Sequence, residues 1–404
     1  MIRRPPRSTL SSSSAASDVY KRQFSGWVIR NYLINWWVLE KTNSTTIVGL
    51  VAASPTLTVL LIAPLGGQLA DKYSRKKIFL SVRIVSVFLF FIVALSIHLD
   101  FYALPIVVLC FLGIGVQAGF EVPAARNLIL DVATFKFLTL GNSIMEFVNQ
   151  VLSTAGPPII AIFFTSIDDT FIFFSMPAVH LLSVVFAILF FLKFKEPKKE
   201  ESMEDSSKKT LMDGVYYSYN FINIRILLIL TSTILFWGLT QSLIPRISKD
   251  VLNAGSSGYA ILLSTGALGA MAGSIVLPLA QNIFRNSKAI VICITGYSLT
   301  LIGLAFSKSI LLSGIFLGLG GFFHVIWFTV IIILLQTLPD DNHKGRVVGL
   351  FFTFIQLYGL GFIIGGALGD TIGINPTIFI GSSFLIAVHA ICYLASKNFR
   401  SLKS

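Results

Sequence analysis

The chain has 404 residues, of which 54% are hydrophobic and 12% are charged, and its mean hydropathy is +0.80. Soluble domains carry about a quarter charged residues, so this composition indicates lipid rather than water as the main solvent. The net charge of +12 is spread over short segments between apolar runs. It forms no basic helix, and therefore does not indicate a nucleic-acid-binding protein.

Residues 1–23 differ from everything that follows them. They are basic and serine-rich, and they lack the apolar stretch that a signal peptide needs. They resemble translated adapter or vector sequence, and a genuine disordered tail is the alternative. We treat them as a non-native leader. On that interpretation the first helix of the native protein is truncated here.

Twelve apolar runs after residue 23 are long enough to cross a membrane as helices, which takes about 20 residues. They are too long for spanning β-strands of about ten residues, and they lack strand-like alternation. The predicted spans are Phe24–Leu39, Thr46–Ala70, Ile78–His98, Tyr102–Phe120, Leu138–Phe164, Phe171–Leu192, Ile226–Ile244, Ala260–Ala280, Ile290–Phe306, Leu311–Leu335, Val347–Leu368 and Thr377–Ala395. We therefore predict an all-α integral membrane protein with twelve transmembrane helices.

The longest polar break, Lys193–Asn223, divides these spans six and six. Its mixed charge and serine content are typical of a flexible, solvated linker. We predict an N-terminal six-helix bundle at 24–192, a cytoplasmic linker at 193–225, a C-terminal bundle at 226–396 and a cytoplasmic tail at 397–404. Two equal bundles joined by a linker are expected of a secondary transporter built from parallel halves.

Lysine and arginine fall unequally on the two sides of the membrane. Outside the leader and the spans, 20 of them lie in loops on one side and 4 on the other. Because cytoplasmic loops accumulate positive residues, the richer side is cytoplasmic. Both termini are then inside, which agrees with an even number of spans. We expect a multi-pass protein of a bacterial inner membrane.

Signatures of an enzyme or an ATP-driven pump are not found in this sequence. No G-x-x-x-x-G-K-[S/T] loop occurs, and catalytic acids, histidines and serines do not cluster at one depth. The cysteines Cys110, Cys293 and Cys392 sit in separate apolar runs, without disulfide or metal-ligand spacing. We therefore expect no enzymatic activity, no cofactor and no metal.

One motif stands between the second and third spans, at Pro64–Lys77. Its central string reads G-G-x-L-A-D-x-x-x-R-K-K. Gly66 and Gly67 permit close helix packing in lipid, Asp71 ends the span, and the basic cluster holds the loop inside. In the second loop of a twelve-span chain, this string resembles the signature of the major facilitator superfamily.

Further segments are similar to one branch of that superfamily, which includes the enterobactin exporter and the macrolide and multidrug efflux proteins. The resemblance covers residues 24 to about 396. Its fifth span departs from the fuller antiporter pattern, because Ile159-Ile160 stand where paired glycines often follow the Gly-Pro. The matching segments are Gly26–Arg30, Trp37–Ser44, Glu121–Asn127, Gly141-Asn142 with Gly156-Pro157, and Pro339–Val347.

The resemblance implies a cytoplasmic latch, meaning a contact that holds the outward-facing state closed on the inside. Asp71 would face the positive N-terminus of the eleventh helix, which favours a carboxylate. Arg75 would pair with the acidic end of the fourth helix. The alternative is that this loop only anchors the topology. The predicted latch residues are Gly67, Asp71, Arg75, Glu121 and Arg126.

The same resemblance implies that the first, fourth, seventh and tenth helices line a central substrate cavity. Aromatic walls with a few polar groups suit a large amphipathic ligand. For each residue the alternative is ordinary packing, and for Arg30 it is a structural pairing with a carboxylate. The candidate cavity residues are Arg30, Gln117, Trp237, Gln241, His324 and Trp327.

Glu146, Asn149 and Gln150 share one face of the fifth span, at spacings i, i+3 and i+4. A carboxylate inside a membrane is a candidate proton carrier, because desolvation favours its neutral form. A polar packing seam is the alternative. With protons as the coupling ion, we expect a monomeric exporter of a small amphipathic molecule, either drug-like or a siderophore. An importer of a small nutrient is the alternative.

The latch hypothesis makes a direct prediction for Asp71. Asp71→Asn should leave the amount of membrane-inserted protein unchanged and should impair transport, because the neutral amide interacts less strongly with a helix N-terminus than a carboxylate does. Immunoblotting of membranes measures insertion and a transport assay measures rate. A normal transport rate in this variant would exclude the latch.

Overall fold

A computed structural model describes residues 30–132, 151, 154–160, 162, 171–193, 211–280, 286–340 and 343–400. Contacts divide the chain into two compact units: unit 1 is Met1–Val38 with Ser54–Glu200, and unit 2 is Leu39–Ala53 with Glu201–Ser404. The regular elements of the described residues are helices, and ten helical stretches are long and apolar enough to cross a membrane. These ten overlap every predicted span except the first and the fifth, which lie partly outside the described residues.

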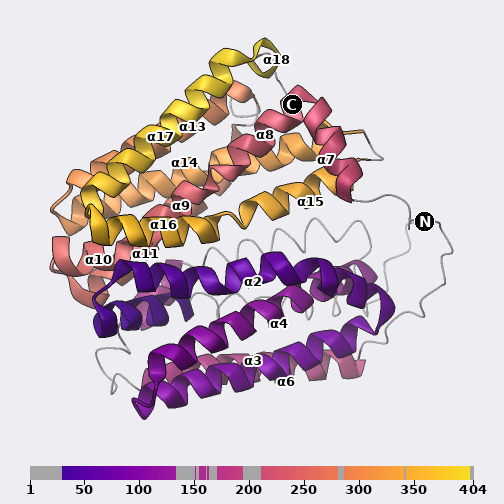
Figure 1. The fold of residues 1–404 in the computed structure, drawn as a ribbon, viewed down its shortest axis with the longest axis vertical. Helices are drawn as coiled ribbons and strands as arrows, with labels where there is room; N and C mark the ends of the chain where they lie inside the picture. The colour runs from indigo at the N-terminus through magenta and orange to yellow at the C-terminus, as the bar shows by residue number, and fades with distance from the viewer. Residues whose placement is uncertain are drawn as a thin grey trace, which may run out of the picture. The chain divides into compact units, whose positions relative to one another are not determined.

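Unit 1 is built around α3, which packs against α4 on one side and α6 on the other (Figure 1). Its described elements are residues 30–38 of a helix that runs from 30 to 42, α2(Thr45–Lys72) from Ser54 onward, α3(Arg75–His98), α4(Ala103–Val132), the 3₁₀ turn η1(Phe171–Phe174) and α6(Ser175–Lys193). Lys76 Nζ donates a hydrogen bond of 2.8 Å to the carbonyl of Phe191, which ties the start of α3 to the end of α6.

Unit 2 contains the start of α2 and all elements from α7 onward. In its core, α14 packs against α11 and α13, and α13 packs against α17 (Figure 1). The elements are α7(Leu211–Asn220), α8(Ile222–Ser232), α9(Ile234–Gln241), α10(Ile244–Arg246), the π-helical turn η3(Ile247–Val251), α11(Gly255–Leu279), α13(Ser287–Phe306), α14(Ile310–Thr337), α15(Lys344–Ile355), α16(Tyr358–Thr371), α17(Ile374–Ala395) and α18(Lys397–Arg400).

Two predicted spans are interrupted within the membrane. Ile226–Ile244 is split into α8 and α9 at Thr233, and Val347–Leu368 is split into α15 and α16 at Gln356-Leu357. At both breaks the backbone N–H groups bond three residues back, as Thr233 does to Leu230 (3.2 Å) and Gln356 to Thr353 (3.1 Å). Lipid offers no hydrogen-bonding partner for backbone groups. These tightened turns satisfy the N–H groups at each break, so an interrupted helix is tolerated there.

The linker is predicted to be flexible, but its last third contains a helix, α7(Leu211–Asn220). One face of α7 is buried, including Gly214, Tyr217 and Ser218 at i, i+3 and i+4. The ring of Tyr217 stacks on His343 with centroids 4.0 Å apart, and its hydroxyl donates to Asp340 at 3.3 Å. Burial of this face compensates for the low hydrophobicity of the helix. Residues 194–210 lie outside the described part.

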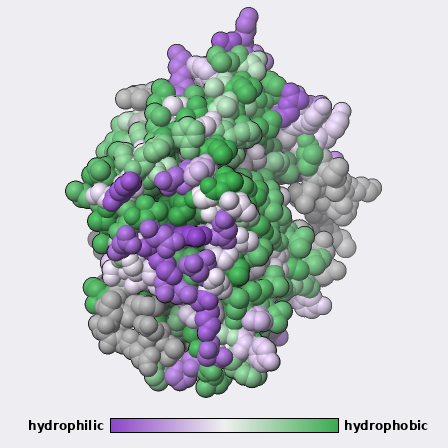
Figure 2. All heavy atoms as spheres, turned by 60° about the vertical axis from the view of Figure 1, so that its left-hand side comes forward, coloured by the Kyte–Doolittle hydropathy of each residue, from purple (hydrophilic) through white to green (hydrophobic). Residues whose placement is uncertain are grey.

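Large aliphatic and aromatic side chains are exposed on many helices, as expected where lipid covers the surface. Leu61, Leu109, Leu192, Leu279 and Leu311 are each more than half exposed. The face in Figure 2 is mostly hydrophobic, with its hydrophilic residues gathered in patches. A soluble protein rarely exposes so much contiguous apolar surface. The predicted membrane-spanning, all-α architecture is thus consistent with the surface as well as with the helices.

Glycines bring the backbones of α11 and α14 into contact. A Cβ atom added at Gly269 would overlap the carbonyl of Gly318, and one added at Gly321 would overlap the carbonyl of Gly266. Small residues at helix interfaces are the usual means of close packing in membranes, where the hydrophobic effect does not drive helices together. This seam therefore fixes the distance between two central helices of unit 2.

We predict that Gly269→Val destabilises unit 2 by about 1–3 kcal/mol or more, the usual cost of overpacking a close contact. Gly349→Ala is the matched control, because a Cβ at Gly349 would meet nothing within 4 Å. Alanine there should be neutral or stabilising by up to about 1 kcal/mol through helix propensity. Thermal unfolding in detergent compares the two variants. Equal stability of the Gly269→Val variant and the native chain would disprove the contact.

Candidate functional site

A buried ion pair lies in the interior of unit 1, between α3 and α4. Arg83 is eight residues after the start of α3, which places it about 12 Å along the helix, and its side chain is 1% exposed. Its Nη2 pairs with Oε1 of Glu121, and Gln117 Nε2 donates to Oε2 of the same carboxylate. The Arg83 cluster, defined as Arg83, Gln117 and Glu121, thus places one guanidinium and one amide beside a single carboxylate.

The Arg83 cluster contains two residues that the sequence analysis named. Glu121, a predicted latch residue, pairs with Arg83. Gln117, predicted to line the cavity, bonds to Glu121. Sequence reasoning missed Arg83, although the signal was present: it is an arginine within the predicted span Ile78–His98, and such charges need a partner.

Arg30 lies on the helix at residues 30–38 and makes mixed contacts. Its Nη2 and Nε lie 3.4 Å from Oδ1 of Asn31, and its guanidinium lies 5.7 Å from the ring centroid of Phe111 on α4. His180 of α6 packs on Phe90 of α3 with ring centroids 4.3 Å apart, and its Nδ1 is 2.9 Å from the carbonyl of Met176. Unit 1 thus gathers its interior polar groups around α3 and α4.

The remaining predicted latch residues are placed here by their helices only. The structure assigns Gly67 and Asp71 to α2, Arg75 to the first position of α3 and Arg126 to α4, and their side chains lie outside the described part. The predicted proton-coupling residues Glu146, Asn149 and Gln150 also lie outside the described residues.

An aromatic cluster in unit 2 brings together three of the predicted cavity residues. Trp237 of α9 stacks on His324 of α14, with ring centroids 5.9 Å apart and an interplanar angle of 22°. His324 in turn meets Trp327 edge to face at 5.3 Å. Tyr297, Tyr358 and Phe362 complete the cluster at 5.4–6.2 Å from His324 or Trp237. Gln241 is the last residue of α9, one turn after Trp237.

Two polar atoms in this cluster are buried without a hydrogen-bond partner among the described residues: Nδ1 of His324 and Nε1 of Trp327. Buried polar atoms in folded proteins nearly always have a partner. Both therefore keep the capacity to bond a polar group of a ligand, next to ring faces that an apolar ligand could cover. The sequence analysis did not identify Tyr297, Tyr358 and Phe362, because aromatic residues in apolar spans carry no signal of orientation.

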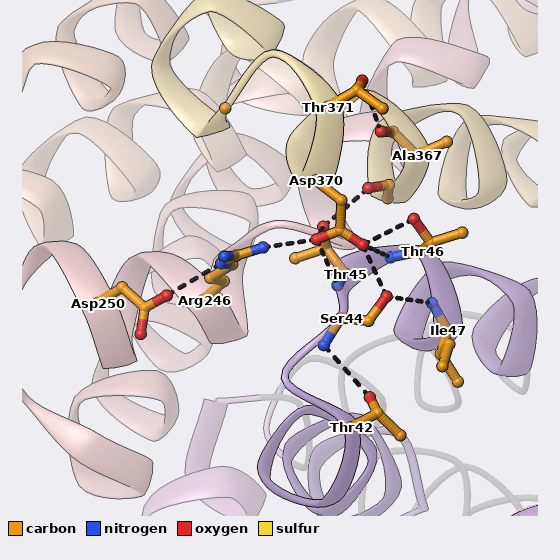
Figure 3. Close-up of polar contacts among 12 residues, drawn as sticks. Thr42, Ser44, Thr45, Thr46, Ile47, Arg246, Asp250, Ala367, Asp370 and Thr371 are labelled. Atoms are coloured by element: carbon orange, nitrogen blue, oxygen red, sulfur yellow. Dashed lines mark hydrogen bonds and ion pairs between the residues drawn. The ribbon is translucent and has the colours of Figure 1, made fainter.

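A second site in unit 2 is polar and is centred on the carboxylate of Asp370, near the end of α16 (Figure 3). Asp370 accepts hydrogen bonds from the backbone N–H groups of Thr45 (3.0 Å) and Thr46 (2.9 Å), at the start of α2. The hydroxyl groups of Ser44, Thr45 and Thr46 lie 2.6–2.7 Å from the same carboxylate. Asp370 therefore acts as an N-terminal cap of α2 that is supplied by another helix.

Basic residues from the end of the seventh predicted span complete this site. Arg246 Nη1 lies 2.5 Å from Asp370 Oδ1, while its Nε pairs with Asp250 at 2.9 Å (Figure 3). Lys249 pairs with Glu40 at 3.3 Å. We call Ser44, Thr45, Thr46, Arg246 and Asp370 the Asp370 cluster. Sequence reasoning missed it, although an acid just after a predicted span and three consecutive hydroxyl residues before another were visible signals.

The Arg83 cluster yields a stability prediction. Arg83→Met should lower the free energy of unfolding by about 3–5 kcal/mol, because it leaves Glu121 buried without its cation. The double variant Arg83→Met/Glu121→Met should regain most of that loss. Lys249→Met, in the exposed pair with Glu40, is the control and should cost only about 0–1 kcal/mol. Unfolding in mixed micelles measures all three, and a double variant no more stable than Arg83→Met would contradict the pairing.

Comparison with known proteins agrees with the helices and with the signature loop. Residues 23–360 match the family model described as Major Facilitator Superfamily. The chain is 21% identical over 371 residues to the staphyloferrin A transporter of Staphylococcus aureus, covering 91% of this chain and 92% of that one. It is 21% identical over 369 residues to macrolide efflux protein A of Streptococcus pyogenes, covering 89% of each.

Solved structures show the same fold at low sequence identity. The nucleoside transporter NupG matches with a TM-score of 0.78 at 11% identity, covering 96% of this chain and 99% of that one. A bacterial homolog of the human lysosomal transporter Spinster, in an inward-facing and unoccupied conformation, matches with a TM-score of 0.74 at 14% identity, covering 98% of each. The resemblance and fold predicted from the sequence are confirmed: this chain is a multi-pass membrane protein that belongs to the major facilitator superfamily.

Proposed function

We propose that this protein exports a small amphipathic molecule, drug-like or a siderophore, by proton-coupled alternating access. The observation that carries the proposal is the aromatic cluster of unit 2, where Trp237 and His324 stack and two buried polar atoms have no partner in the described part of the chain. Such a surface suits a ligand with an extended apolar face and a few polar groups. Neither an enzyme nor a channel would need this combination on a transporter fold.

The names of the relatives support export. One is named macrolide efflux protein A, a name that states export, and another is named staphyloferrin A transporter. The likeness to a nucleoside transporter is at 11% identity and carries the fold only. Import of a small nutrient by the same fold is the second candidate function. The direction of transport distinguishes import from export.

In the proposed mechanism, two six-helix bundles rock about a central site. The predicted excess of lysine and arginine in one set of loops supports cytoplasmic termini in a bacterial inner membrane. We propose a monomer as the working unit. Asp71 remains the proposed cytoplasmic latch, with Gly67, Arg75 and Arg126, and Glu146 remains the proposed proton carrier, with Asn149 and Gln150 on the same helical face. Glu121 is also proposed for the latch, and it pairs with Arg83.

Transport into inverted vesicles tests function, direction and coupling together. With an imposed proton gradient, we expect vesicles to accumulate a member of a panel of siderophores and hydrophobic drugs, and an uncoupler to abolish the uptake. Trp237→Ala should raise KM about tenfold, or about 1.4 kcal/mol, by removing a stacking surface. Phe88→Leu, an exposed aromatic position on α3, is the control.

The outcomes separate the alternatives. Accumulation in whole cells without uptake into inverted vesicles would indicate import. Gradient-driven export that persists in Glu146→Gln would remove Glu146 as the carrier. An unchanged KM for Trp237→Ala, with a substrate identified, would show that the aromatic cluster is not the binding surface.

A further inference from the structure

Asp370 is poorly placed for its own helix and well placed for another. It is the second-last residue of α16, where the helix macrodipole is negative and a carboxylate is unfavourable. The first turn of α2, where the dipole is positive, has no acidic residue of its own. Asp370 fills that position from α16, with two backbone N–H groups and three hydroxyl groups around it. The position of Asp370 is therefore unfavourable within α16 alone, and its contact with the start of α2 compensates for that cost.

The same contact holds a segment of α2 that is packed apart from the rest of its helix. Leu39–Ala53 clusters with unit 2, whereas Ser54 onward belongs to unit 1. At this start of α2 the backbones touch: a Cβ at Gly366 would overlap the carbonyl of Thr45, and a Cβ at Gly49 would overlap that of Phe362. Thr45 Oγ1 also lies 2.8 Å from the carbonyl of Gly366.

We propose that the Asp370 cluster is the extracellular latch of the transport cycle, closed in this structure and broken when the protein opens to the outside. The proposal rests on alternating access as proposed above. Spans 2 and 11 belong to different predicted bundles, so a rocking motion must separate the start of α2 from the end of α16. The predicted orientation places both of these ends outside.

The two ends of one helix pair then carry opposite latches. Asp71 lies near the C-terminal end of α2 and is predicted to face the N-terminus of the eleventh span. Asp370 lies near the C-terminal end of that same span, α16, and caps the N-terminus of α2. Rocking that joins one end separates the other. Each carboxylate would therefore stabilise a different state, and their balance would set the population of the two states.

The strength of this latch lies in the cap rather than in the surrounding ion pairs. Arg246 is 23% exposed and Asp250 is 40% exposed, and exposed pairs of this kind contribute little. Asp250 bonds to Arg246, and it forms no hydrogen bond or ion pair with the described residues of α2. Asp370→Asn and Asp250→Asn thus remove one negative charge each from the same site, and we expect the first of them to weaken the closure.

A cysteine reporter tests the latch without requiring a known substrate. Val48, one turn into α2, is fully buried, so Val48→Cys should react slowly with a membrane-impermeant maleimide. In whole cells we expect Asp370→Asn to raise the labelling rate of that cysteine about tenfold, and Asp250→Asn to leave it unchanged. The chain without Val48→Cys gives the background from Cys110, Cys293 and Cys392. Inverted vesicles should show no such increase.

A second variant reaches the same contact by sterics. Gly366→Ala should force α16 away from the Thr45 carbonyl and should raise the labelling rate as Asp370→Asn does. Folding is checked by the membrane content and thermal unfolding of each variant. Unchanged labelling in folded Asp370→Asn and Gly366→Ala overturns the latch, as does an equal rise in Asp250→Asn. Because labelling needs no substrate, absence of export from the whole panel would count against the proposed function and leave this test intact.

Discussion

Hydrocarbon offers no hydrogen-bonding partner, and this constraint accounts for most of the architecture. Each backbone polar group within a span must be satisfied inside the protein, so the described elements are helices. Where a span is interrupted, at Thr233 or at Gln356, tightened turns re-satisfy the backbone. In lipid the hydrophobic effect does not draw helices together. Glycine contacts such as those between α11 and α14 supply close van der Waals packing instead.

The same constraint distinguishes two carboxylates with different surroundings. Glu121 lies beside α3, 3% exposed, and its compensation is a guanidinium and an amide on neighbouring side chains. Asp370 lies at a helix end with its side chain 24% exposed, and its compensation is mostly the N-terminus of another helix. A deep ion pair is costly to separate because both charges stay buried without a partner. A contact at a helix end can exchange its partners for water, which makes it suited to opening and closing.

The aromatic cluster, which we propose as the binding surface, is built from elements that are distant in sequence. Trp237, His324 and Tyr358 come from α9, α14 and α16. The short helices α9 and α16 pack on each other, and a Cβ at Gly238 would overlap the carbonyl of Tyr358. Because the two backbones are in contact there, the large aromatic rings pack beside that contact. The polar atoms of His324 and Trp327 then give an otherwise apolar surface some directionality.

The sequence by itself determined the solvent, the helical class, most span positions and the family, because long apolar runs and the Gly66–Lys77 string are local patterns. Through the family resemblance it also predicted that Trp237, His324 and Trp327 line one central cavity. Only the tertiary structure decided the partners: Arg83 beside Glu121, Gln117 on that carboxylate, and Asp370 on the start of α2. Hydropathy reports how deep a residue lies in the membrane, but not which way it faces around a helix or which distant helix it meets.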